Sequence, residues 1–119
     1  MIVDDELINI KVTQKYLKNA GYTEFVTTAD PTAAVELIRQ ERPDAILLDI
    51  MMPDIKGYEV CKKIKDNPDT ANTKIIVLSA YLDEDKFKKM KQYGADACFS
   101  KPFPLPQLKE EVARLLELR

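Results

Sequence analysis

Short apolar runs recur along the chain, separated by longer stretches in which apolar residues follow a helical spacing. The runs cover residues 2–3, 25–26, 45–48 and 75–78, and a weaker run covers residues 97–99. The first, third and fourth runs lack polar alternation, which is typical of strands buried on both faces of a sheet. We therefore expect five short strands that alternate with helices.

The longer stretches predict amphipathic helices, because their apolar side chains recur on one helical face. In three of them these side chains are Leu7, Ile10, Leu17 and Ala20; Val35 and Ile38; and Leu105, Leu108, Val112, Leu115 and Leu116.

Residues that start and stop helices fall between these segments. Asp30 followed by Pro31 predicts the start of the second helix, and Pro43 marks its end. Gly21 and Gly94 stand where a helix gives way to a strand, as C-cap glycines do. The remaining signals are a turn at residues 67–70 and Pro106 at the start of the last helix.

Alternation of strands and helices in so short a chain indicates an α/β, doubly wound fold, because parallel neighbours need right-handed crossover helices. We expect one five-stranded parallel sheet with helices on both faces, formed by a single domain over residues 1–119. No internal repeat or linker divides the chain.

Composition narrows the class of protein further. Eighteen basic and twenty acidic side chains give a net charge of −2, so direct nucleic-acid binding and membrane association are not expected. We expect a cytoplasmic protein, with Cys61 and Cys98 as reduced, buried thiols. The chain has no histidine, which excludes Ser-His-Asp chemistry and any internal phosphohistidine relay.

Polar side chains follow the predicted strands at their carboxyl ends. Asp4 and Asp5 end the first strand, Asp49 the third and Ser79 the fourth, and the fifth leads into Lys101. Ligands of open parallel sheets bind at this edge. Taken singly, Asp5 or Ser79 could cap a helix and Asp49 could begin a loop. Jointly, the pattern favours a site.

The chemistry of this set suits a phosphoryl group and a metal ion. Crowded carboxylates repel one another unless a cation neutralises them, and Mg²⁺ prefers carboxylate, water and phosphate oxygens. A lysine and a hydroxyl can hold further phosphoryl oxygens. Asp49 ends the central strand, and aspartate is a known covalent phosphoryl acceptor, so we predict Asp49 as the nucleophile.

Four separated motifs resemble the receiver domain of two-component response regulators, and the resemblance covers the entire chain. The motifs are Ile2-Val3-Asp4-Asp5-Glu6, Leu47-Leu48-Asp49-Ile50-Met51-Met52-Pro53, Ser79-Ala80 and Lys101-Pro102-Phe103. Their joint order and spacing are specific, whereas a single Asp-Asp or Lys-Pro pair is not.

The resemblance implies that Asp49 is the phosphoacceptor and a ligand of Mg²⁺. Asp5 and the Met51 backbone carbonyl would also bind Mg²⁺, with Asp4 acting largely through water. It further implies a flavodoxin-like strand order of 2-1-3-4-5. Ser79 and Lys101 would hold the phosphoryl oxygens, and the bond before Pro102 would be cis.

The resemblance also implies partners and a mechanism. A histidine kinase or a histidine phosphotransfer protein would present a phosphohistidine, and Asp49 would take its phosphoryl group with Mg²⁺ bound. The added charge would draw Ser79 and Lys101 inward and shift the surface of the fourth helix, fifth strand and fifth helix. That surface would contact an effector domain or protein. We thus expect a signalling domain and no turnover enzyme.

Two departures from the family pattern matter for this mechanism. Cys98 stands where the family usually has an aromatic switch residue, and strand alternation points Phe99 to the opposite face. We expect a switch that is weaker or routed differently. Met51 and Tyr81, two residues after Asp49 and Ser79, are bulky and orient water poorly, which predicts slow hydrolysis of the aspartyl phosphate.

Other functions fit the residues less well. A magnesium-dependent phosphatase with an aspartyl nucleophile usually has a second aspartate at the position that Met51 occupies. A degenerate receiver that serves only as a scaffold would not need the acidic set, Ser79 and Lys101. A flavin-binding relative would need a glycine-rich phosphate loop, and the chain has three glycines.

Overall fold

A computed structural model describes residues 1–4, 6–30, 33–50, 55–79, 83–100 and 104–117. Within them, five strands alternate with five helices. The elements are β1 (Ile2–Val3), α1 (Leu7–Asn19), β2 (Thr27–Thr28), α2 (Ala34–Glu41), β3 (Ala45–Ile50), α3 (Ile55–Asp66), β4 (Lys74–Ser79), α4 (Glu84–Gln92), β5 (Ala97–Ser100) and α5 (Leu105–Glu117).

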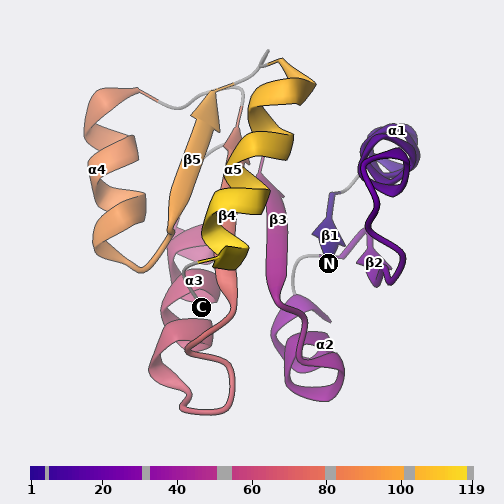
Figure 1. The fold of residues 1–119 in the computed structure, drawn as a ribbon. Coiled ribbons are helices and arrows are strands. Elements are labelled where there is room, and N and C mark those ends of the chain that lie inside the picture. Colours follow the sequence, from indigo (N-terminus) through magenta and orange to yellow (C-terminus); the bar gives the residue numbers. More distant parts are fainter. Residues whose placement is uncertain (5, 31–32, 51–54, 80–82, 101–103, 118–119) are drawn as a thin grey trace.

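The strands form one parallel sheet in the order β2-β1-β3-β4-β5 (Figure 1). The predicted fold class and strand order are therefore confirmed. The pairing register places Val3 beside Leu48, and Leu48 beside Val77. All carboxyl ends consequently lie at one edge of the sheet, which we call the carboxyl edge, and all amino ends lie at the other, the amino edge.

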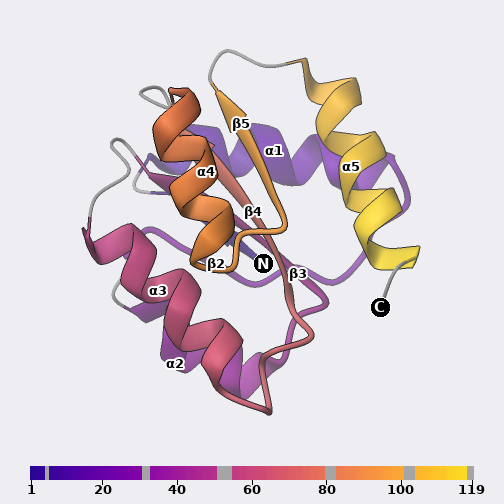
Figure 2. The same cartoon turned by 90° about the vertical axis from the view of Figure 1, so that its left-hand side faces the viewer.

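Successive residues of each strand enter opposite halves of the core, as expected for strands buried on both faces. Val3, Leu48 and Val77 pack with residues of α2, α3 and α4. Leu47 and Ile76 pack with residues of α1 and α5 on the other face. Figure 2 shows the sheet with α3 and α4 on one side and α5 on the other.

The second strand lies two residues later than its apolar signal. Ile2 N–H donates to the Val26 carbonyl at 2.9 Å and Asp4 N–H to the Thr28 carbonyl at 3.1 Å, so Thr27 and Thr28 are the paired residues. Phe25 instead packs against the core beneath α1 and α5. Position beside β1, rather than apolar character, decides where this short strand forms.

Two details of the helices differ from prediction. Helix α2 begins at Ala34 with Ala33 at its N-cap, and Ala33 N–H donates to the Asp30 carbonyl at 3.1 Å. Pro31 lies outside the described residues. In α1, Ile10 and Leu17 are buried as predicted, whereas Leu7 in the first turn is 64% exposed.

The predicted helix ends are confirmed. Gly21 and Gly94 directly follow the C-cap residues of α1 and α4 with φ of 109° and 116°, a conformation that favours glycine. Arg42 ends α2 in the left-handed conformation. No helix in the described ranges is long and apolar enough to cross a membrane.

Candidate functional site at the carboxyl edge

The register of the sheet aligns three of the predicted site residues. Val3 pairs with Leu48, and each is followed at once by an aspartate, so Asp4 and Asp49 come at neighbouring strand ends. Ser79 closes β4 on the next strand and is paired with Ser100, the last residue of β5. The predicted residues Asp5, Met51 and Lys101 fall outside the described residues.

All three aligned side chains are buried. Asp4 is 4% exposed, Asp49 8% and Ser79 0%. Buried carboxylates persist only where hydrogen bonds or opposite charges compensate for lost hydration. For Asp4, one carboxylate oxygen (Oδ1) accepts a hydrogen bond from Glu6 N–H at 2.9 Å, which ties the end of β1 to the start of α1.

The structure also tests the separate capping and loop roles that single residues could have had. The N-cap of α1 is Glu6 and that of α4 is Asp83, whose carboxylate accepts from Lys86 N–H at 2.8 Å. Asp49 lies within β3 and Ser79 within β4. The alternatives in which Ser79 caps a helix or Asp49 begins a loop are therefore wrong, whereas Asp5 lies outside the described residues.

The described donors suit a hard cation. Asp4 and Asp49 provide carboxylate oxygens at adjacent strand ends, the ligand type that Mg²⁺ prefers. Among the residues that the structure describes, no three Cys, Asp or Glu side chains gather as a metal site. Asp5, the third acid of the predicted set, lies beyond those residues. Two carboxylates with water and phosphate oxygens fit magnesium.

Cys98 lies on the face of the sheet covered by α3 and α4, and Phe99 packs on the other face, as strand alternation predicted. The Cys98 side chain is 9% exposed, and burial raises the pKa of its thiol to about 11. Burial also raises the pKa of the Cys61 thiol, to about 12. Both are buried free thiols, protonated at neutral pH and poor nucleophiles.

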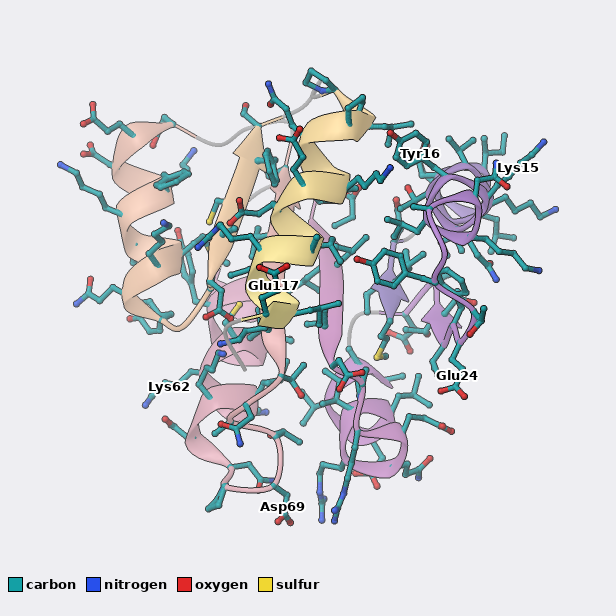
Figure 3. The ribbon with its side chains drawn as sticks, viewed as in Figure 1. Lys15, Tyr16, Glu24, Lys62, Asp69 and Glu117 are labelled. Carbon is teal, nitrogen blue, oxygen red and sulfur yellow. The ribbon has the colours of Figure 1, made fainter. Side chains whose placement is uncertain are left out.

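One feature beside the site was missed from sequence. Leu7, Ile8 and Val12 in the first turns of α1 are 64%, 75% and 52% exposed. Helix α1 begins three residues after Asp4, so this apolar surface flanks the carboxyl edge. Ile8 and Val12 are four residues apart, so they lie on one face of the helix, and that face differs from the one that carries the buried Ile10 and Leu17. This spacing is the sequence signal from which the exposed apolar surface could have been predicted. Figure 3 shows Tyr16 on the side of α1 toward α5 and Lys15 pointing outward.

Comparison with known proteins identifies the family. The chain belongs to the response regulator receiver domain family, whose model matches residues 1–113. It is therefore a phosphorylation-dependent signalling domain of two-component systems rather than a conventional enzyme. Domains of this family act with histidine kinases and effector domains.

Similar proteins agree with this assignment. The polar-differentiation response regulator DivK of Brucella anthropi is 33% identical over 116 residues, covering 98% of this chain and 94% of that protein. A receiver domain of a DNA-binding response regulator from Colwellia psychrerythraea 34H superposes with a TM-score of 0.87 at 29% identity, over 98% of this chain and 95% of that one. A receiver domain of a histidine kinase from Syntrophus aciditrophicus superposes with a TM-score of 0.84 at 29% identity, over 98% of this chain and 87% of that one.

Proposed function

We propose that Asp49 accepts a phosphoryl group from the phosphohistidine of a histidine kinase or a histidine phosphotransfer protein. The observation that carries this proposal is the pair of buried carboxylates, Asp4 and Asp49, at neighbouring strand ends of a receiver-family sheet. One Asp49 carboxylate oxygen attacks phosphorus as the bond to the donor imidazole nitrogen breaks. The chain has no histidine, so the phosphohistidine comes from another protein.

The neighbouring residues of the predicted set hold the transferred group. Ser79, fully buried at the end of β4, donates its hydroxyl hydrogen to a phosphoryl oxygen. Lys101, which follows β5 directly, supplies a positive charge to another oxygen. Asp4, Asp5, Asp49 and the Met51 carbonyl hold Mg²⁺, directly or through water. When bound, the ion offsets the negative charge of the carboxylates and of the phosphoryl group.

Intact-mass measurement after incubation with acetyl phosphate and Mg²⁺ tests the proposal. We expect one phosphoryl adduct on the parent, none on Asp49→Asn, and none on the parent when Mg²⁺ is chelated. Asp44→Asn is the matched control, because Asp44 is an exposed aspartate that directly precedes the other end of the same strand. An adduct on Asp49→Asn would refute the assignment, and sustained phosphate release from many phosphate esters would favour a phosphatase.

We assign the docking of the phosphodonor to the exposed apolar side chains Leu7, Ile8 and Val12. Any donor must bring its phosphohistidine to the carboxyl edge, and these residues lie on the helix that begins beside it. Exposed apolar groups of this size are typical of interaction surfaces. The proposed occupant is an apolar surface of the protein that bears the phosphohistidine.

The Ile8→Glu variant tests this docking surface. It should accept phosphoryl from acetyl phosphate at the parental rate but at least about tenfold more slowly from a phosphohistidine protein, because one buried apolar contact is replaced by a charge. Ala113→Glu, an exposed change on α5, is the control. Equal slowing with both donors would place the defect in the site, and no slowing with either would refute the docking role.

The signal leaves through the surface of α4, β5 and α5. A phosphoryl group adds a charge of about −1.5 to −2, which biases a pre-existing equilibrium of that surface toward effector binding. Cys98 stands at the position of β5 where the family usually has an aromatic switch residue. We therefore propose that phosphorylation is coupled to the effector surface more weakly here, or by another route. Cys98→Tyr should then enlarge the phosphorylation-dependent gain in effector affinity, and a gain equal to the parental one would count against this idea.

The aspartyl phosphate is proposed to hydrolyse slowly. Met51 and Tyr81, both outside the described residues, are bulky, and neither has an acidic or amide group to orient an attacking water. Replacing both residues with asparagine should speed the loss of the adduct, followed by intact mass over time. Unchanged decay would contradict the role of these two side chains.

A further inference from the structure

Helix α4 has few apolar contacts with the body of the domain. Most of its residues are charged, and Met90 is its one fully buried side chain. Phe87 and the C-cap residue Tyr93 pack partly against the same core. A helix anchored by so few apolar side chains can change position at low cost in free energy.

An aromatic stack fixes the carboxyl-terminal end of α4 to α3. The rings of Tyr58 in α3 and Tyr93 lie with centroids 5.2 Å apart and planes inclined by 20°. Lys89 Nζ lies 4.9 Å from the centroid of the Tyr58 ring, so a cation from α4 joins the same ring. Tyr58 is 7% exposed, which removes this contact from water and strengthens it.

The stack joins the two helices that follow the site strands. Helix α3 comes after β3, which carries Asp49, and α4 comes after β4, which ends in Ser79. The amino-terminal end of α4 is therefore close in sequence to Ser79, whereas its other end is held by Tyr93. A displacement at Ser79 would then reach first the amino-terminal end of a helix that the stack restrains at its other end.

We propose that the Tyr58–Tyr93 stack is the pivot of α4 and sets how far α4 responds to phosphorylation. This inference rests on the proposed function of Asp49. The stack restrains α4 in both states, and the phosphoryl group changes the position of the amino-terminal end about it. Weakening the stack therefore loosens α4 before phosphorylation and reduces the difference that phosphorylation makes.

Hydrogen exchange of the α4 amides, with and without acetyl phosphate and Mg²⁺, tests the pivot on the full chain. In Tyr93→Leu, α4 amides should exchange about two- to tenfold faster without phosphodonor, the factor that such ring pairs typically provide. The phosphorylation-dependent change in exchange should fall below half of the parental change. Tyr16→Leu, which removes a ring from the opposite face of the sheet, is the matched control.

The outcomes separate this inference from the proposed function. Absence of an adduct on the parent would overturn both. An adduct with parental α4 exchange in Tyr93→Leu, or an equal effect of Tyr16→Leu, would overturn the pivot alone. If Tyr93→Leu does not fold, Lys89→Met, which removes the cation above Tyr58, should speed α4 exchange by about twofold. Unchanged exchange in Lys89→Met would then overturn the pivot.

Discussion

The two edges of the sheet both hold buried or half-buried polar groups, but their charges are balanced differently. At the amino edge, Lys65 Nζ donates to Asp96 Oδ2 at 2.9 Å, to the Thr73 carbonyl at 2.8 Å and to the Ala71 carbonyl at 3.4 Å. Asp96 Oδ2 also accepts from Ile75 N–H at 2.8 Å. One cation therefore meets one anion, and all three ammonium hydrogens have acceptors.

At the carboxyl edge, like charges are gathered instead. Asp4 and Asp49 are both acidic and both more deeply buried than Lys65 or Asp96. Such an arrangement is stabilised by cations brought to it, from Lys101 and from a bound metal in the proposed site. The comparison teaches that a cation–anion pair stabilises the fold at the amino edge, whereas the buried charges that the structure describes at the carboxyl edge are of one sign, as expected of a site for a cation.

The largest effect on phosphorylation should come from a substitution at the carboxyl edge. Asp49→Asn should abolish the phosphoryl adduct while leaving the free energy of unfolding unchanged or raising it by about 1 kcal/mol in chelator, because like-charge repulsion is relieved. Urea denaturation measures the free energy of unfolding, and intact-mass measurement detects the adduct. A clear fall in the free energy of unfolding would mean that Asp49 stabilises the fold, as Asp96 does.

The opposite result is expected at the amino edge. Lys65→Met should lower the free energy of unfolding by about 3 kcal/mol, because it leaves Asp96 half-buried without its cation. The adduct on Asp49 should still form. Lys62→Met is the matched control, since the Lys62–Asp66 pair is exposed and its loss should leave the urea midpoint unchanged. Equal losses of stability in the two variants would show that the Lys65–Asp96 pair stabilises the fold no more than the exposed Lys62–Asp66 pair does.

The two left-handed glycines sharpen the picture of the amino edge. A Cβ added at Gly94 would lie 2.5 Å from Cγ of Lys65, whereas one at Gly21 would meet nothing within 4 Å. Gly21→Ala should therefore cost about 1 kcal/mol of backbone strain. Gly94→Ala should cost about 2 kcal/mol or more, because Lys65 is held by three hydrogen bonds and cannot move freely. Equal thermal shifts would contradict this restraint.

The smallest effect concerns an exposed ion pair on α5. The hydrogen bond from Arg114 lowers the pKa of Glu111 below its ordinary value of 4.5 in the folded protein. This pair therefore adds stability that is present above the unfolded pKa and lost as pH falls through the folded pKa. Glu111→Gln should be slightly less stable at pH 7 in urea denaturation, and about equal to the parent near pH 3. A difference that persists at acid pH would point to packing instead of charge.

Some elements could be predicted because one physical signal dominates them. Strands β3 and β4 are buried on both faces, so their residues form an unbroken apolar run in the sequence. Strand β2 lacks that signal, since Thr27 is exposed and Thr28 is half-buried, and the nearest apolar run lies two residues before it. Its position depends on hydrogen bonds to β1, which are a property of the assembled sheet.

The same division applies to the site. Asp4, Asp49 and Ser79 could be found because each follows or ends a recognisable apolar strand, and parallel strands bring their carboxyl ends to one edge. The exposure of Leu7 and Ile8 was not found, because an apolar residue in a helix is most often placed on its buried face. Which face of α1 meets the sheet depends on how α1 packs.

By itself, the sequence determined the alternation of strands and helices, the parallel sheet and the carboxylates at strand ends, because local periodicity and chain direction suffice for these features. Only the tertiary structure decided how deeply Asp4 and Asp49 are buried at the carboxyl edge. It also decided that Lys65 meets Asp96 and that Tyr58 stacks on Tyr93. These pairs lie 31 to 45 positions apart in the chain. Contacts over such separations form only when the whole sheet brings its helices and strand ends together.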